Sequence, residues 1–435
     1  MKIEVQSRKL VKPCTPTPQH LRIYNISLLD ELNPSMHVIR ILYYHHNPPL
    51  NNNAKPLLQD SLAKDSLAKV LPLFHPLAGR YVKDTHVVDC NDEGAEFSEA
   101  LVDFDLLHLT AGPNSTESEQ LNNLLPLDIA ADPADPMLAV QVNTFRCGGL
   151  AIGVCASHRI FDSGSLGIFL AAWADVASRG NGEFVLRAPD YFGSPSSLYF
   201  PSENVDPLDF GVSKTRDRSI VGKRFVFDKT AISRLRHRNG SIPARGPSRV
   251  MVVSAVVTQA ILRADRAKNG GSKAALIGQA INVRERTVPP VPKQACGTWA
   301  ALSYLECDPS ERAGVESLVG KMREAAMRGV EDCGRILSDK EFGRWVMVDS
   351  YLEAAKKADR PDYKAIWITD FSKFGEYQLD FGFRKPVWVS LASVPLKDHI
   401  VLMNTKENDG IEAWVYLHES DMPFLERDEV LTSML

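Results

Sequence analysis

Residues 137–174 read MLAVQVNTFRCGGLAIGVCASHRIFDSGSLGIFLAAWA, and this stretch decides the fold of the N-terminal half. Two apolar runs flank Cys147-Gly148-Gly149, which is the pattern of a β-hairpin. The second run ends at His158, and an apolar helical pattern follows Asp162. The stretch therefore predicts two strands and a buried helix, with a histidine and an acid where the second strand meets the helix.

His158 stands at a place that suits chemistry. A side chain at the end of a buried strand is held rigidly and can still reach a cleft. An imidazole with its usual pKa of about 6.5 is a competent general base at neutral pH. The alternatives are structural: His158 also fits a hydrogen-bonded core residue, and Asp162 also fits a helix N-cap.

A general base needs a group to deprotonate, and the sequence offers two possibilities. The first is an internal serine nucleophile, because SGSLG around Ser165 is close to the G-x-S-x-G pattern. Ser163 replaces the first glycine of that pattern, and Ser165 falls inside the predicted helix rather than on a strand-to-helix turn. The second is a hydroxyl or amine of a bound substrate that attacks an acyl donor directly, and the sequence favours it.

Composition excludes several classes of protein. The net charge of −4 over 435 residues comes with no basic block, which argues against nucleic-acid or membrane-surface partners. No run of about 18 apolar residues occurs, and the N-terminus has no apolar signal segment. The seven cysteines are scattered without CxxC spacing, so neither a disulfide framework nor a metal site is expected. We expect a cytoplasmic protein.

The length and the pattern along the chain predict two domains of mixed α/β class. Helices and strands alternate over residues 1–178, and the pattern restarts at 221–435 with a strand and helix at 223–238. Asp228 and Ser248 are the expected N-caps of two helices in this second half. Residues 179–220 are rich in glycine and proline and form the predicted linker.

Two motifs about 220 residues apart carry a resemblance to a known family. SHRIFD (157–162) and LDFGFRKP (379–386) resemble the HxxxD and DFGWG motifs of the plant BAHD acyltransferases. Further blocks follow the order of that family, among them SLAKVLPLFHPLAGR, VDCNDEGAEF, INVRERTVPPVP and GIEAWV. The likeness runs almost end to end and is strongest to the branch that contains vinorine synthase and salutaridinol acetyltransferase.

The resemblance implies two chloramphenicol-acetyltransferase-like domains joined by a long crossover, with a central channel between them. His158 would be the general base in that channel. Asp162 would face away from the substrate and pair with Arg284, or failing that with Arg286. The DFGWG-like motif, assigned to the C-terminal domain, would support the fold near the donor through Asp380 and Gly382, among other retained residues (Phe381, Lys385 and Pro386).

This chain departs from the family pattern at three positions. Phe383 replaces the tryptophan of DFGWG and keeps an aromatic wall without the indole N–H. Arg384 replaces the final glycine, so a positive φ there becomes harder to adopt. Whether Arg384 contacts the donor or is a solvated surface residue is left open. Thr298, after Gly297, stands where the family usually has asparagine.

The resemblance also suggests residues for both substrates. Ser248 and Arg249 open a helix and offer a cation and free N–H groups to the phosphates of coenzyme A, as Phe383 offers an aromatic surface. The alternative for Ser248 and Arg249 is a simple helix cap with an exposed arginine. Five residues are candidates for the acceptor pocket, each with core packing as its alternative: Tyr43, His46, Thr369, Phe371 and Lys373.

The expected function is acyl transfer from acyl-CoA, with acetyl-CoA the expected co-substrate, to a hydroxyl of a plant specialised metabolite such as an alkaloid or terpenoid. His158 would take the proton, and no acyl-enzyme would form. No tightly bound cofactor is expected, and the protein would act as a monomer on a small-molecule acceptor. The alternatives are an N-acyltransferase that forms amides, an idle relative that only binds a ligand and, more distantly, a serine hydrolase.

Overall fold

The structure is a computed structural model. It describes residues 1–33, 35–45, 62, 66–110, 118–179, 192, 218–238, 247–286, 290–308, 314–338, 340–394 and 396–435. The chain divides into two compact units. Unit 1 consists of Met1–Arg216, Pro292–Trp299 and Phe374–Ser393, and unit 2 of Asp217–Val291, Ala300–Lys373 and Val394–Leu435. The mixed α/β class predicted from the sequence is confirmed in both.

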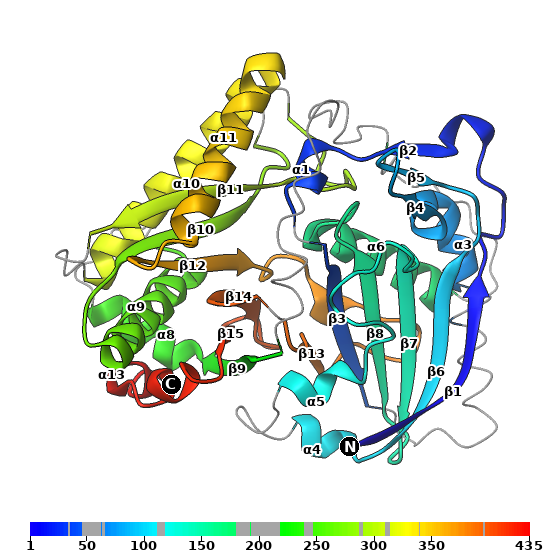
Figure 1. Cartoon of the computed structure of the whole chain (residues 1–435). Helices are drawn as coiled ribbons and strands as arrows, with labels where there is room; N and C mark the ends of the chain where they lie inside the picture. Colours follow the sequence, from blue (N-terminus) through cyan, green and yellow to red (C-terminus); the bar gives the residue numbers. More distant parts are fainter. Residues whose placement is uncertain are drawn as a thin grey trace. The chain divides into compact units, whose positions relative to one another are not determined.

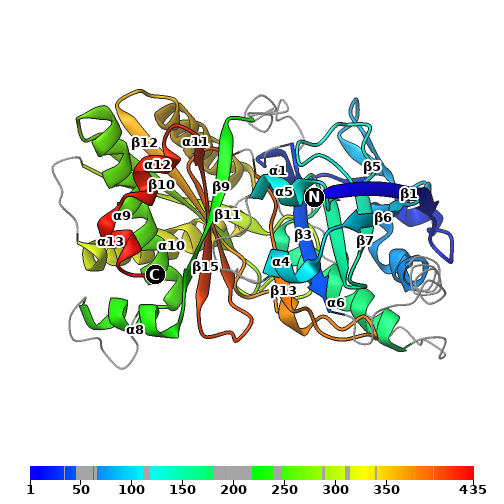
Figure 2. The ribbon, with the colours of Figure 1, turned by 90° about the horizontal axis from the view of Figure 1, so that it is seen from below.

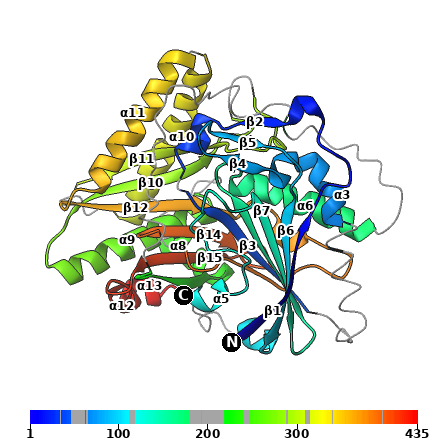
Figure 3. The same cartoon turned by 45° about the vertical axis from the view of Figure 1, so that its right-hand side comes forward.

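Unit 1 is built on a six-stranded sheet in the order β1-β6-β7-β8-β3-β13 (Figures 1 and 3). Its strands are β1 (Lys2–Val11), β3 (His37–Tyr44), β6 (Ala95–Asp103), β7 (Leu138–Phe145), β8 (Leu150–Ser157) and β13 (Trp388–Ser390). β7 and β8 pair antiparallel around Cys147-Gly148-Gly149, which confirms the predicted hairpin. Every residue of β3, β7 and β8 is buried, so these strands form the centre of the unit.

Close approach of the chain to the sheet explains one glycine of β8. A Cβ added at Gly153 would lie 2.1 Å from the carbonyl oxygen of Leu124. The rest of the unit consists of a small sheet, β2 (Ile23–Asn25), β5 (Val87–Asp89) and β4 (Arg80–Val82), and of short helices around the long α6. The helical segments are η1 (Gln19–Leu21), α1 (Leu28–Glu31), α3 (Ala68–Val70), η3 (Leu71–Ala78), α4 (Leu106–Thr110), α5 (Ser118–Asn122), α6 (Ser163–Arg179) and η5 (Glu376–Gln378).

The predicted boundaries at 1–178 and 221–435 differ from the observed units. Residues 292–299 and 374–393 belong to unit 1, although they come from the C-terminal half. The physical reason is strand pairing: β13 adds to the edge of the first sheet, with Trp388 opposite Tyr43 and Ser390 opposite Ile41. The expectation that the DFGFR segment belongs to the C-terminal domain is therefore wrong. The linker predicted at 179–220 lies almost wholly outside the described residues, and the predicted channel stays a prediction.

Unit 2 is built on a second six-stranded sheet, in the order β11-β10-β12-β14-β15-β9. Its strands are β9 (Ile220–Phe227), β10 (Ala274–Asn282), β11 (Ala300–Cys307), β12 (Tyr363–Asp370), β14 (His399–Asn404) and β15 (Ile411–His418). Its helices are α8 (Lys229–Arg238), α9 (Arg249–Asn269), α10 (Val315–Ser338), α11 (Lys340–Ala358), α12 (Met422–Glu426) and α13 (Glu429–Thr432). One core joins α9 and α10 to alternate residues of the sheet. Figure 2 shows α9 and α10 among the helices of this unit.

The local signals that open helices in unit 2 act as predicted. Ser248 caps α9 by accepting the N–H of Met251 at 3.2 Å. Asp228 caps α8 by accepting the N–H of Ala231 at 2.7 Å. Since a capping side chain needs only its own helix, such signals can be recognised in a sequence without knowledge of the tertiary structure.

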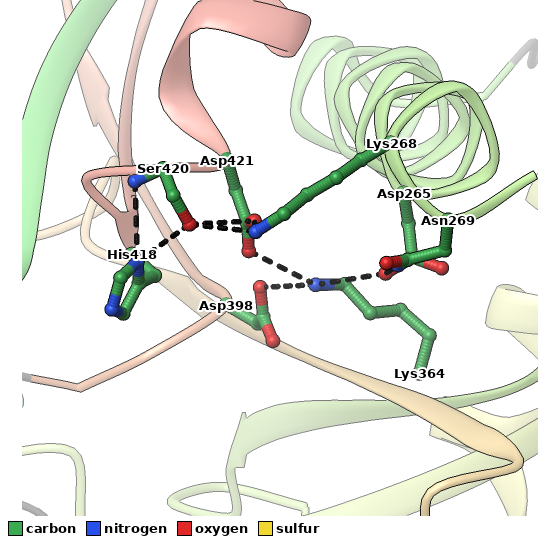
Figure 4. Close-up of polar contacts among 8 residues, drawn as sticks. All are labelled: Asp265, Lys268, Asn269, Lys364, Asp398, His418, Ser420 and Asp421. Carbon is green, nitrogen blue, oxygen red and sulfur yellow. Dashed lines mark hydrogen bonds and ion pairs between the residues drawn. The ribbon is translucent and has the colours of Figure 1, made fainter.

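A cluster of charges lies in unit 2, where α9 meets the starts of β12 and β14 and the chain after β15 (Figure 4). Lys364 is buried, and its Nζ lies 2.7 Å from Asp398, 3.7 Å from Asp265 and 4.0 Å from Asp421. Lys268 also pairs with Asp421. We call these five residues the Lys364 cluster. It ties together four segments that are distant in sequence.

Candidate active site

His158 lies in unit 1, directly after β8. Its backbone N–H donates to the carbonyl of Met36 at 2.9 Å, and the preceding Ser157 N–H donates to Met137 at 2.9 Å. The backbone that carries the ring is therefore fixed by hydrogen bonds to two different segments of the chain. The residue is partly exposed, and Nδ1 is a buried atom with no hydrogen-bond partner among the described residues.

The environment of His158 favours its neutral form. Burial lowers the pKa of the imidazole below its ordinary value of 6.5. The residue's own backbone and the charge of Asp162 raise the pKa by less than burial lowers it. A neutral imidazole at physiological pH can accept a proton, and because Nδ1 is shielded, Nε2 is the nitrogen left for that role.

Asp162 acts on the backbone around it. Its Oδ1 accepts the N–H of Ser165 at 2.7 Å, and its carbonyl accepts that of Leu166 at 3.0 Å, which makes Asp162 the N-cap of α6. Its Oδ2 accepts the N–H of Trp299 at 2.9 Å. The residue is only 5% exposed. Asp162 thus fixes both the start of the helix and a distant segment of unit 1.

Ser165 takes part in the same hydrogen-bonded contact between α6 and segment 297–299, and it is not placed as a nucleophile. It lies in α6, fully buried, and its hydroxyl donates to the carbonyl of Gly297 at 2.7 Å. The same oxygen accepts the N–H of Gly297 at 3.1 Å. A hydroxyl engaged on both sides inside a helix does not have the geometry of a hydrolase nucleophile.

Arg284 and Arg286 lie in unit 2, after β10. The backbone N–H of Arg284 donates to Oδ1 of Asn282 at 3.0 Å, and its Nη1 lies 3.3 Å from the same oxygen. The pairing of Asp162 with Arg284 or Arg286 would join different units and stays a prediction.

The DFGFR segment forms a tight turn in unit 1. Oδ1 of Asp380 accepts the N–H groups of Gly382 and Arg384, each at 2.9 Å. Gly382 has φ of 92°, and a Cβ there would lie 3.3 Å from Cα of Ser178. Asp380 and Gly382 therefore shape this turn, and their expected support of the fold near the donor stays a prediction.

The aromatic residues of the segment pack inside unit 1. Phe381 packs edge-to-face on Trp173, with ring centroids 4.9 Å apart. Phe383, proposed from the sequence as a donor contact, packs edge-to-face on Tyr44 at 5.0 Å and is partly exposed. The observed contacts of Phe383 are those of a packing residue.

Arg384 adopts a positive φ of 138°, although the residue that replaces the glycine of the motif has a Cβ. This region is strongly unfavourable for a residue with a Cβ and costs about 1–3 kcal/mol. We expect Arg384→Gly to raise the melting temperature, with a net gain of about 1 kcal/mol after the extra entropy of glycine in the unfolded chain. Arg384→Ala is the control, since it removes the side chain and keeps the strain. If alanine stabilises as much as glycine, the backbone is not the cause.

The predicted donor residues lie in unit 2 at the start of α9. Ser248 caps that helix, and the side chain of Arg249 lies against the turn between β14 and β15. Nη1 of Arg249 donates to the carbonyl of Asn408 at 2.5 Å, and Nη2 lies 3.4 Å from its Oδ1. The guanidinium is thus oriented at the N-terminus of a 21-residue helix, which suits an anion.

The five residues predicted for the acceptor pocket have different surroundings. In unit 2, Oγ1 of Thr369 lies 2.9 Å from Nε2 of His399, Phe371 is half-buried and Lys373 is exposed. Tyr43 is corrected: it is fully buried in β3, bonded to Ser390 at 3.0 Å and stacked on Trp388, so it is a core residue. His46 lies outside the described residues.

The sequence analysis did not foresee the burial of two polar residues, Asp30 and Thr298. Asp30 and Thr298 are both buried, and each has an oxygen without a hydrogen-bond partner among the described residues. The one signal was the pattern Ser27-x-x-Asp30, which is that of a capping box. Burial of a carboxyl group cannot be read from that pattern.

Two kinds of feature are absent from the described residues. No helix there is both long and apolar enough to cross a bilayer. No group of three or more histidine, cysteine, aspartate or glutamate residues there is placed to hold a metal ion.

Comparison with known proteins gives matches along the whole chain. A model of the Transferase family matches residues 1–432. A pelargonidin 3-O-(6-caffeoylglucoside) 5-O-(6-O-malonylglucoside) 4'''-malonyltransferase from Salvia splendens is 36% identical over 98% of both chains. Vinorine synthase from Rauvolfia serpentina is 35% identical over 97% of this chain and 96% of its own.

Solved structures agree. The crystal structure of vinorine synthase matches with a TM-score of 0.81 and 33% identity, over 100% of this chain and 98% of that one. F. sporotrichioides TRI101, complexed with coenzyme A and T-2, has a TM-score of 0.73 over 94% of this chain and 98% of its own. At 17% identity the latter shows the fold alone.

Proposed function

Because the chain belongs to the Transferase family, the BAHD acyltransferases, we propose that it transfers an acetyl group from acetyl-CoA to a hydroxyl of a plant specialised metabolite. An alkaloid or terpenoid acceptor is supported by relatives such as stemmadenine O-acetyltransferase from Catharanthus roseus, 32% identical over 98% of this chain. The enzyme would work as a cytoplasmic monomer without a tightly bound cofactor.

The observation that carries the mechanism is the state of His158: a partly exposed imidazole, depressed in pKa and rigidly carried by its backbone. Nε2 would take the proton of the acceptor hydroxyl as its oxygen attacks the thioester carbonyl. The tetrahedral intermediate would then collapse, breaking the carbon–sulfur bond, and the imidazolium would return the proton to the thiolate. The engaged hydroxyl of Ser165 agrees with a direct transfer.

Roles for the substrate residues follow from their surroundings. Arg249, oriented by Asn408 beside the capped start of α9, would hold a phosphate of coenzyme A. The hydroxyl of Thr369 and the imidazole of His399 would offer polar contacts to the acceptor, with Phe371 as an apolar neighbour. Asp162 would keep the helix start and segment 297–299 in place.

The direct mechanism predicts a kinetic pattern. Initial rates measured at several levels of both substrates should give intersecting lines, because donor and acceptor must be bound together. The assay pairs acetyl-CoA with a panel of alkaloid and terpenoid alcohols. Parallel lines, or a protein acylated by donor alone and detected by mass spectrometry, would show a covalent intermediate instead.

The same panel of substrates, assayed with different acyl-CoA donors and with amines, distinguishes the possible donors and the alternative functions. The 36% identical malonyltransferase makes malonyl-CoA the competing donor, and a higher kcat/KM for it would replace acetyl in the proposal. Turnover of amines but not alcohols would make the enzyme an N-acyltransferase. Tight acceptor binding without turnover of any donor would show a binding protein.

A further inference from the structure

Arg159 directly follows His158 and has no role in the proposed mechanism. Its Nη2 donates to the hydroxyl of Ser35 at 2.8 Å. Its guanidinium carbon lies over the ring of Tyr81, 4.4 Å from the ring centroid. Ser35 is buried, whereas Arg159 and Tyr81 are partly exposed, and all three residues belong to unit 1. The side chain of Arg159 therefore joins the residue after His158 to two distant parts of the same unit.

Ser35 belongs to the short segment that also binds the backbone of His158. The carbonyl of Met36, the next residue, accepts the His158 N–H at 2.9 Å. The carbonyl of Ser35 accepts the N–H of Ala131 at 3.2 Å, so this segment is itself fixed to another part of unit 1. His158 through its backbone and Arg159 through its side chain thus hold the same segment.

Tyr81, the second partner of the guanidinium, is also fixed. It lies in β4, opposite Val88 of β5. Its hydroxyl lies 3.2 Å from Nδ1 of His86, which in turn lies 3.2 Å from Oε1 of Glu31. A planar guanidinium can lie on the face of an aromatic ring and donate hydrogen bonds from its edge at the same time, which the compact ammonium group of a lysine cannot do.

The turn at residues 158–160 connects the end of β8 to the N-cap of α6, and the hydrogen bonds within it are long. The N–H of Ile160 donates to the carbonyl of Ser157 at 3.3 Å, and the N–H of Arg159 to the hydroxyl of Ser157 at 3.4 Å. Both distances exceed the usual range for such bonds. The contacts of the Arg159 side chain therefore add a restraint that the turn's own hydrogen bonds supply only weakly.

Arg159 acts on His158 through geometry and not through charge. Burial lowers the pKa of the imidazole, and the groups that oppose burial are the residue's own backbone and Asp162. Arg159 is not among the groups that shift this pKa. Its contacts instead restrain the backbone from which the imidazole projects.

We propose that Arg159 is a positioning residue: bonded to Ser35 and stacked on Tyr81, it fixes the turn at residues 158–160 and with it the orientation of the His158 ring. Its kinetic consequence rests on the proposed function. Nε2 must lie within hydrogen-bond reach of the acceptor hydroxyl during proton transfer, and a displacement of about 1 Å can cost about 100-fold in rate. A loosened turn should therefore lower kcat and leave the binding of both substrates nearly unchanged.

The experiment compares the parent with Arg159→Ala, Arg159→Lys and the control Arg146→Ala, which removes an exposed arginine of unit 1. Rates are measured at a temperature where circular dichroism shows every variant folded. Arg159→Ala should lower kcat about 10- to 100-fold without a matching rise in KM. Arg159→Lys keeps the charge but loses the planar group, so it should recover only part of kcat. Full activity of either variant, or a loss confined to KM, would overturn the proposal.

A double-variant comparison tests the contact with Ser35. Ser35→Ala removes the acceptor and should lower kcat about 2- to 10-fold, as expected for one hydrogen bond. The same change made in Arg159→Ala should have almost no further effect, because the bond is already absent. Losses that multiply in the double variant would show that Ser35 and Arg159 act independently, and would overturn the role of this bond.

The pH profile separates geometry from charge. The acid limb of kcat caused by protonation of His158 should keep its midpoint in Arg159→Ala and in Arg159→Lys, while the plateau falls. A general loss of folded enzyme would lower kcat in the same way at every substrate concentration, but it would not make the effect of Ser35→Ala depend on residue 159. A shifted midpoint would show that Arg159 acts on the charge of the ring, and would overturn the positioning role.

A measurement without substrate reports on the ring itself. The ring resonances of His158, identified in NMR spectra by their loss in His158→Ala, should shift or broaden in Arg159→Ala. Those of the exposed His20 should stay unchanged. Unchanged His158 resonances would overturn the proposal. If the parent turns over no acceptor at all, the proposed function fails, whereas the ring resonances still test whether Arg159 fixes His158.

Discussion

His158→Ala is expected to lower kcat by at least about 100-fold, because it removes the group proposed to take the proton in the transition state. The melting temperature should change little, since the side chain is partly exposed and its Nδ1 makes no hydrogen bond within the described residues. His20→Ala, at an exposed histidine, is the matched control and should keep full activity. Near-normal turnover in a folded His158→Ala protein would exclude the mechanism.

The pH profile gives a second measure of the same residue. Burial lowers the pKa of His158 below 6.5, and the neutral ring is the active form. The rate should therefore fall as the pH drops through this lowered pKa. Protonation of His158 should cause no fall between pH 8 and pH 6.5. His158→Gln should show no such acid limb in its residual activity. If the limb persists, another group causes it.

Lys364→Met is expected to destabilise the protein by about 3–5 kcal/mol, because it removes the cation paired with the buried carboxylates of Asp398 and Asp265. Asp398 and Asp265 each have a side chain only 10% exposed, so water cannot replace the lysine. The control is Lys357→Met, whose pair with Glu306 is 31% and 45% exposed and should contribute less than about 1 kcal/mol. Urea unfolding measures both.

Two further tests identify the cause of that loss. Burial already raises the pKa of Asp398, and Lys364 opposes this, so without the lysine the folded protein should bind protons more readily. The defect of Lys364→Met should therefore shrink as the pH falls towards 5. Adding Asp398→Asn should recover part of the stability. A defect independent of pH and of residue 398 would point to lost packing instead.

The sequence by itself was enough for features that depend on neighbours in the chain. The hairpin of β7 and β8 followed from apolar runs around Cys147-Gly148-Gly149, and the caps Asp228 and Ser248 from short polar side chains before apolar helices. Each signal is local because the hydrogen bond or the backbone geometry involved spans only a few residues.

Only the tertiary structure decided which distant segments complete unit 1. Segment 374–393 joins the first sheet through the backbone pairing of β13 with β3, and segment 292–299 is bonded through its backbone to the side chains of Asp162 and Ser165. Neither of these two segments carries a side-chain pattern that names its partner. For the same reason Tyr43 was predicted as a pocket wall and is buried, and the burial of Asp30 and Thr298 was not foreseen. Burial and the pKa shifts that follow from it depend on what packs against a residue, and those partners lie hundreds of residues away.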